Sequence, residues 1–455
     1  MSGSSSSSRP EPRELRRELG LLSATMIVVG GIIGGGIFFT PARVAQTLPS
    51  GGWVLAIWAI GGVVGLAGAL TFAELGAMLP DAGGQYVYIR DAFGRLPAFL
   101  YGWMQLASIA TASDAAVALV FAEYAGRIVN VAAIGGTFPL AVGTVVLLTI
   151  VNYIGLKPGT ALQNAVTLSK IVALALLIGA GLVTWGRIGG APPPAAPAAP
   201  AMGLLAGLAA AFIPVLFTVG GWENVNMVAG EVRDPGRLLP RALGLGLGIV
   251  IVCYLGANAV YLHALGHDGL AASTAVASDT AMRIIGPAGR TAITVAIMLS
   301  ILGIVNVILL ATPRVFYAMA KDGLFLSFAA RVHPRFGTPH LSILLMGGWA
   351  VALLFIARGQ VNSLVDGVVF ADWIFFGLAA ASIFVLRRRR PDAPRPYRTW
   401  GYPVVPGFFV LAAVAAVASA VASAPRTSAL GSALLVVGAA VYALALRGAP
   451  GSRSS

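Results

Sequence analysis

Two glycine-rich stretches interrupt apolar segments of the chain. The first, VVGGIIGGGIFFTP (Val28–Pro41), has five glycines within the stretch Gly30–Gly36. The second, FTVGGWENVN, is Phe217–Asn226. Glycine is about 1 kcal/mol less favourable than alanine inside a helix, and it lets a ligand approach the backbone closely. Both stretches therefore predict helices that are broken and that bind a ligand at the break.

A broken helix offers two kinds of unpaired backbone group. The start of its second half exposes N–H groups, where the helix dipole also favours negative charge, and the end of its first half exposes carbonyl oxygens. Together they can hold a carboxylate and an ammonium group, and an α-amino acid carries both. The alternative is that the glycines only let helices pack closely. We favour a binding site, because paired interrupted segments are typical of transporters built from inverted repeats.

Four charged side chains fall inside apolar segments, where a charge is costly unless polar groups surround it. Lys170, in NAVTLSKIVALALLI, is expected to face a polar cavity; the alternative is that its side chain extends along the helix to the membrane surface. The other three are Asp114, Glu223 and Asp372. Glu223 and Asp372 would suit a site for cationic substrates, but we favour the alternative that each is protonated or paired with a nearby donor.

The composition is that of an integral membrane protein. Of the 455 residues, 58% are hydrophobic and only 10% are charged, and long uncharged stretches recur from about residue 20 to residue 447. These stretches lack the alternation of β-barrel strands, so an all-helical bundle is expected.

A helix of about 20 apolar residues crosses a bilayer, and the chain has twelve such segments. They lie near residues 20–46, 52–78, 96–125, 134–155, 161–186, 203–230, 239–263, 289–318, 341–357, 366–386, 403–422 and 427–446. Glu74 and Glu123 are near segment ends, so we expect them to be solvated.

Most Lys and Arg residues lie in alternate connecting segments and at both termini, which is the positive-inside pattern. This pattern places both termini in the cytoplasm. It also accounts for the net charge of +13 without a nucleic-acid partner. We therefore expect a multi-pass protein of the cytoplasmic (inner or plasma) membrane.

The segments group into two halves of five helices with smaller flanking parts. The predicted parts are a cytoplasmic tail at 1–19, a first half at 20–190, a second half at 203–390, two peripheral helices at 403–447 and a tail at 448–455. The stretch APPPAAPAAPAMG, residues 191–203, reads as a stiff extracellular linker between the halves.

No catalytic, metal or cofactor site is expected. The four histidines, in loops or at segment ends, lack metal-ligand spacing. Gly34–Gly36 has no P-loop lysine and follows no strand. The only cysteine, Cys253, excludes a disulfide framework. An enzyme would need a nucleophile and a base or a ligand cluster, so we predict that the protein is not one.

Several motifs, in order, resemble the amino acid–polyamine–organocation (APC) superfamily. GGIIGGGIFFTP is similar to its first-span pattern, and VLFTVGGWENVNMVAGEVRDPGRLLPRAL resembles the sixth span of the L-type amino acid transporter branch. ELGAMLPDAGGQYVYIRDAFGRLPAFLYGW, VALVFAEY, ATPRVFYAMAKDGLF and RRRRPDAPRPYR also resemble that branch. The resemblance covers about residues 18–402. It implies a LeuT-type fold of two inverted five-helix repeats with discontinuous helices 1 and 6, and alternating access around a central amino-acid site.

The resemblance assigns the substrate carboxylate to the first break. Backbone amides of Gly34, Gly35 and Gly36 would bind it, and Gly31 and Ile32 would line the same pocket. The family usually has serine at the position of Gly35, so a hydroxyl contact is absent here.

The resemblance assigns the substrate ammonium to the second break. Carbonyl oxygens of Phe217, Thr218 and Gly220 would accept from it, and Phe217 matches an aromatic gate over the site. Ser113 matches a pocket-lining serine in the third span. Trp222 adjoins the break, is expected to pack against it and is counted among the predicted substrate-binding residues, as are Glu223 and Asp372.

The charged residues also have counterparts in the family. Lys170 matches a fifth-span lysine that takes the place of a sodium ion in sodium-independent relatives. From there it could bridge carbonyls of the first span to the eighth, and it could carry a proton. Glu223 and Asp372 fall where the L-type branch often has asparagine near the substrate side chain.

The leading hypothesis is a sodium-independent transporter of neutral L-amino acids, working by exchange or proton coupling. A cationic amino acid or polyamine carrier is the alternative within transport, and a non-transporting amino acid receptor is the alternative of another class. L-type relatives in animals pair with a heavy subunit through a cysteine in an extracellular loop. Because Cys253 lies inside the seventh span, we expect no such disulfide-linked partner.

Overall fold

The computed structural model describes residues 14–187, 203–357 and 362–445. Within these ranges all regular structure is helical, apart from an isolated bridge between Leu19 and Val232. The predicted C-terminal tail and most of the predicted tail 1–19 and linker 191–203 lie outside the described residues. The all-helical prediction is confirmed for the rest.

The helices divide at the linker. Before it lie α1 (Leu21–Ile32), α2 (Gly36–Ala45), α3 (Gly51–Met78), α4 (Gln85–Phe93), α5 (Arg95–Met104), η1 (Gln105–Ile109), α6 (Ala110–Gly126), η2 (Val131–Ile134), α7 (Thr137–Tyr153) and α8 (Leu156–Val183). After it lie α9 (Leu204–Val219), α10 (Asn224–Met227), η3 (Ala229–Glu231), α11 (Pro235–Ala272), α12 (Val276–Ile285), α13 (Pro287–Ala311), α14 (Pro313–Lys321), η4 (Ser327–Ala330), α15 (His340–Ala357), α16 (Asn362–Arg389), α17 (Val404–Ser423) and α18 (Pro425–Ala445).

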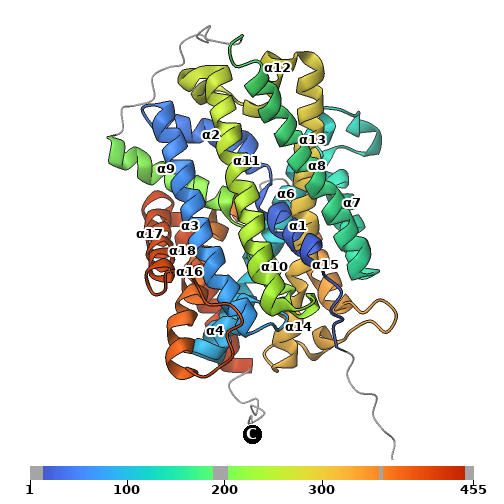
Figure 1. Ribbon diagram of the computed structural model, residues 1–455. Helices are drawn as coiled ribbons and strands as arrows, with labels where there is room; N and C mark the ends of the chain where they lie inside the picture. The colour runs from blue at the N-terminus through green and yellow to red at the C-terminus, as the bar shows by residue number, and fades with distance from the viewer. Residues whose placement is uncertain (1–13, 188–202, 358–361, 446–455) are drawn as a thin grey trace, which may run out of the picture.

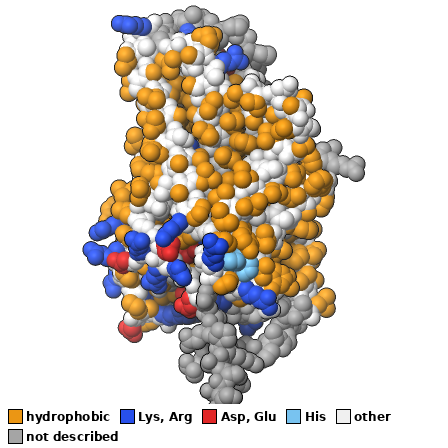
Figure 2. Space-filling model, turned by 90° about the vertical axis from the view of Figure 1, so that its right-hand side faces the viewer, with side chains coloured by type: hydrophobic (Ala, Val, Ile, Leu, Met, Phe, Trp, Pro, Cys, Tyr) orange, Lys and Arg blue, Asp and Glu red, His pale blue; other side chains and the backbone are white. Residues whose placement is uncertain are grey.

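Ten segments in the described part of the chain are long and apolar enough to cross a membrane. Two shorter apolar helices, α7 and α9, lie where the fourth and sixth spans are predicted. The chain is therefore a multi-pass membrane protein. Figure 2 shows a broad hydrophobic surface, with most of the visible Lys and Arg side chains gathered toward one end.

Small residues on α3 let its neighbours approach closely. A Cβ atom at Gly61 would meet the side chain of Val215, and one at Gly65 would lie 2.7 Å from Val219 Cγ1, both on α9. A Cβ atom at Gly68 would meet the ring of Phe409 on α17. Spaced at one helical turn, these glycines form the small-residue face that drives helix packing in lipid. α17 and α18 lie at one side of the bundle in Figure 1.

A buried ion pair joins segments at the end of the bundle where α1 begins. Arg314 of α14 donates to both carboxylate oxygens of Glu231, at 2.6 and 2.9 Å, and both side chains are only 1% exposed. Arg314 also donates to the carbonyl of Leu310. The carbonyl of Glu231 accepts from the amides of Glu18 and Leu19. The pair therefore ties α14 and η3 to the segment that precedes α1.

A second buried acid is held by residues far along the chain. Glu74, expected to be solvated, is 1% exposed and accepts from Arg387 at 2.8 and 2.6 Å and from the amide of Thr399 at 2.6 Å. The expectation was wrong, because α16 and the loop after it cover the end of α3. Glu123 is exposed, as predicted.

Candidate functional site

The first predicted break lies between α1 and α2. α1 ends at Ile32 and α2 begins at Gly36. Within the break, the amide of Gly34 donates to the carbonyl of Ile32 at 2.8 Å. Among the described residues, the amides of Gly35 and Gly36 have no acceptor. Two of the three amides predicted to bind a carboxylate are thus unpaired at the start of a helix, where the dipole favours an anion.

The second break lies between α9 and α10. α9 ends at Val219, and Gly221 has a φ of +105°, which only glycine adopts readily. The carboxylate of Glu223 accepts from the amide of Gly221 at 2.9 Å, and the side-chain amide of Asn224 donates to the carbonyl of Gly221 at 2.9 Å. Two polar side chains thus hold the unwound backbone in place.

The two breaks touch each other backbone to backbone. A Cβ atom at Gly31 would collide with the carbonyl oxygen of Gly221, and one at Gly221 would collide with that of Gly31. The hydroxyl of Tyr254, on α11, donates to the carbonyls of Ile32 at 2.9 Å and Thr218 at 3.2 Å. Only glycine at both positions permits this approach.

Lys170 of α8 forms hydrogen bonds with the backbone of the first break. Its ammonium group donates to the carbonyls of Gly30 at 3.0 Å and Ile33 at 2.8 Å, and the residue is 1% exposed. Ser300 of α13 donates to the same Ile33 carbonyl at 3.1 Å. A Cβ atom at Gly303, also on α13, would lie 2.8 Å from the ammonium nitrogen. The alternative of a side chain reaching the membrane surface was wrong.

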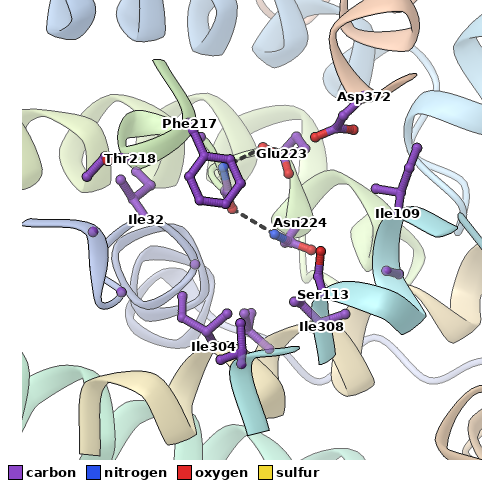
Figure 3. A pocket seen from close by; sticks show the side chains of 18 of the residues that line it. Ile32, Ile109, Ser113, Phe217, Thr218, Glu223, Asn224, Ile304, Ile308 and Asp372 are labelled. Atoms are coloured by element: carbon purple, nitrogen blue, oxygen red, sulfur yellow. Dashed lines mark hydrogen bonds between the residues drawn. The ribbon is translucent and has the colours of Figure 1, made fainter. Parts of the chain in front are cut away.

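A cavity of about 250 Å³ lies between the breaks. Figure 3 shows the side chains that surround it. Every residue predicted to bind substrate lines it, with the exception of Trp222. The lining includes Gly31, Ile32, Gly34, Gly35, Gly36, Ser113, Phe217, Thr218, Gly220, Glu223 and Asp372.

Trp222 packs outside the cavity, contrary to its predicted place in the binding site. It is 3% exposed, and its ring centroid lies 4.9 Å from that of Phe72, 5.8 Å from Phe376 and 6.0 Å from Phe409. Glu223, the next residue, lines the cavity, whereas Trp222 does not. These rings belong to α3, α16 and α17, and the expectation that the indole packs against the broken segment stays a prediction.

Other lining residues were missed from the sequence. Asn224 stands inside the quoted FTVGGWENVN stretch, so its position offered a signal. Ile301, Ile304 and Ile308 of α13 line the cavity too, together with Ile109 of η1. Nothing in an apolar helix distinguishes the residues that face a cavity from those that face lipid.

The acids within spans differ in their surroundings. Glu223 and Asp372 both line the cavity, whereas Asp114 does not. Asp114 is fully buried, and neither of its carboxyl oxygens has a hydrogen-bond partner among the described residues. An ionised carboxylate without partners is very costly in such a place. In the described ranges no three His, Cys, Asp or Glu residues are grouped to hold a metal ion.

Comparison with known proteins identifies the family. A family model described as amino acid permease matches residues 19–445. The chain is 32% identical over 446 residues to b(0,+)-type amino acid transporter 1 of Rattus norvegicus, covering 96% of this chain and 89% of the relative. It is 33% identical over 439 residues to large neutral amino acids transporter small subunit 2 of Homo sapiens, covering 94% and 80%.

These relatives are amino acid transporters of the L-type branch, so the resemblance inferred from the motifs is confirmed, as is the prediction that the protein is not an enzyme. The chain belongs to the amino acid permease family of the APC superfamily.

Proposed function

We propose that the protein transports neutral L-amino acids across the cytoplasmic membrane, with the substrate held between the two breaks. The amides of Gly35 and Gly36 would bind the carboxylate, and the carbonyls of Phe217, Thr218 and Gly220 the ammonium group. The observation that carries this proposal is that the cavity lies between two touching breaks, one with unpaired amides. Relatives named as amino acid transporters support it.

The substrate side chain would occupy the apolar part of the cavity. Ile109, Val117, Ile304 and Ile308 line this part, and its size suits one small or medium side chain. Apolar walls favour burial of an apolar side chain by about 25 cal/mol for each Å² removed from water. This favours a neutral substrate.

A cationic amino acid or a polyamine is the second candidate substrate. Glu223 and Asp372 are the charged side chains among the lining residues, and both are acids. Either could pair with a cationic side chain. The similarity to a relative named as a b(0,+)-type amino acid transporter does not exclude either substrate class.

Transport would be independent of sodium and would proceed by alternating access. Lys170 supports the independence from sodium. Its ammonium group binds two carbonyls of the broken first helix, so a positive charge is already present where a sodium ion would otherwise bind. We propose twelve spans in a LeuT-type arrangement of inverted repeats, at 20–190 and 203–390, with two peripheral helices. The ten long apolar segments, the short apolar α7 and α9, and the paired breaks support it.

We place both termini in the cytoplasm, because of the distribution of Lys and Arg along the sequence.

We also propose that no heavy subunit is attached by a disulfide, although one relative is named as a small subunit. Cys253 is the only cysteine, and its side chain is 8% exposed on α11. Non-reducing electrophoresis of the protein from its native membrane would overturn this proposal if it showed a heavier, reducible species.

The decisive experiment is a panel of labelled amino acids in proteoliposomes. Uptake is measured with and without internal amino acid, sodium and a pH gradient. We expect labelled neutral amino acids to enter the proteoliposomes, and their initial rate of uptake to rise when unlabelled amino acid is present inside. Sodium should leave this rate unchanged. Binding without any counterflow for all amino acids would instead favour a receptor.

A further inference from the structure

The charged side chains that line the cavity carry one sign. Glu223, in the second break, and Asp372, on α16, share the cavity, and no Lys, Arg or His is among its described lining residues. Figure 3 shows both on the same side of the cavity, above Asn224 and Ser113.

Among the described residues, the elements around this acid pair offer no basic partner. Lys170 donates to carbonyls of Gly30 and Ile33 and is not a lining residue. The hydroxyl of Tyr254 donates to backbone carbonyls. Tyr101, on α5, is a further titratable side chain beside α16: it is fully buried, and its ring centroid lies 5.4 Å from that of Phe375.

Two ionised carboxylates in such a site repel each other and lose their hydration. A neutral amino acid does not relieve this, because its ammonium and carboxylate cancel. A proton on the pair does relieve it, as in carboxylate pairs that share one proton. A cationic side chain would relieve it as well, by placing a positive charge beside two ionised carboxylates.

We propose that Glu223 and Asp372 form a proton site inside the substrate cavity, occupied when a neutral amino acid is bound and vacated when a cationic one is bound. A neutral amino acid then crosses with a proton, and a cationic amino acid crosses without it. The loaded cavity has the same net charge in both cases: a half-protonated pair with a neutral substrate, or an ionised pair with a cation. This inference rests on the proposed function.

Exchange between unlike substrates tests the proton site. Proteoliposomes containing a pH-sensitive dye, with the membrane potential clamped, are loaded with arginine and supplied with alanine outside. We expect the lumen to acidify by one proton for each alanine that enters, and the reverse gradient to make it alkaline. Alanine-for-alanine and arginine-for-arginine exchange are matched controls that should move no net protons.

Two variants locate the proton. In Glu223→Gln/Asp372→Asn, the ratio of protons to alanine in whatever exchange remains should fall to zero. Asp114→Asn is the matched control, because it removes a buried acid that does not line the cavity, and its ratio should stay at the wild-type value. A loss of the proton signal in Asp114→Asn but not in the double variant would move the proton site to Asp114 and overturn the proposal.

The outcomes separate this inference from the proposed function. Exchange of alanine for arginine without proton movement overturns the proton site and leaves amino acid transport intact. Transport of alanine with no arginine transport also overturns it, because an ionised pair should accept a cation. No counterflow of any amino acid in the wild type contradicts the proposed function itself.

Discussion

At the scale of single residues, Lys170 stabilises one side of the proposed substrate site. Its ammonium group donates to two carbonyls that the broken helix leaves without an intrahelical partner, one of which, that of Ile33, also accepts from Ser300. A hydrogen bond to a charged group contributes about 1.5–3 kcal/mol, and a buried carbonyl left unpaired is costly. The position of the first break therefore depends on this side chain.

We expect Lys170→Ala to lower the rate of amino acid exchange by roughly tenfold or more, since 1.4 kcal/mol corresponds to about a factor of ten. The measurement is the initial rate of counterflow in proteoliposomes, over a range of pH. Lys157→Ala is the control: its side chain is 80% exposed at the start of the same helix, and its rate should stay close to wild type. An unchanged rate and pH profile in Lys170→Ala would show that the lysine has no part in transport.

At the scale of helices, the contact between the two breaks depends on two glycines. A methyl group at Gly31 would collide with the carbonyl of Gly221, and the converse is also true. Overpacking of this kind costs roughly 1–3 kcal/mol. At Gly221 the φ of +105° adds strain for any other residue.

We expect Gly31→Ala and Gly221→Ala each to reduce exchange by about tenfold or more, the second more severely. Gly244→Ala on α11 is the control, because a Cβ atom there meets nothing within 4 Å. Counterflow rates are compared at equal amounts of folded protein, judged by size-exclusion chromatography. Wild-type rates in both break variants would show that the close contact is not needed for transport.

The sequence predicted what is local and missed what tertiary packing decides. The breaks could be predicted because glycine content and the polarity of neighbours are properties of a few consecutive residues. The burial of Glu74 could not, because its partner Arg387 is distant in the chain. Likewise, the position of Trp222 depends on rings from α3, α16 and α17, which are distant in the chain.

At the scale of the whole molecule, the Arg314–Glu231 pair fixes how distant segments meet. It connects α14 with η3 and, through the Glu231 carbonyl, with the segment before α1. Removing one member of a buried pair leaves an uncompensated charge and typically costs about 3–5 kcal/mol.

We expect Arg314→Ala to lower the melting temperature by several degrees, and Glu231→Gln/Arg314→Met to recover part of the loss because it removes both charges. Arg237→Ala is the control, since Arg237 is 70% exposed and its pair with Asp234 should contribute less than about 1 kcal/mol. Melting is followed by thermal shift in detergent. Equal melting temperatures for Arg314→Ala and Arg237→Ala would contradict a stabilising role for the buried pair.

The position of α17 connects the second break with the surrounding lipid. Phe409, a buried residue of α17, packs against Trp222. On the same helix, the side chains of Leu411 and Val414 are 70% and 60% exposed. A single helix thus separates acyl chains from the residue next to Gly221 and Glu223. A displacement of α17 would therefore reach the segment that we propose to bind the substrate through one aromatic contact, that of Phe409 with Trp222.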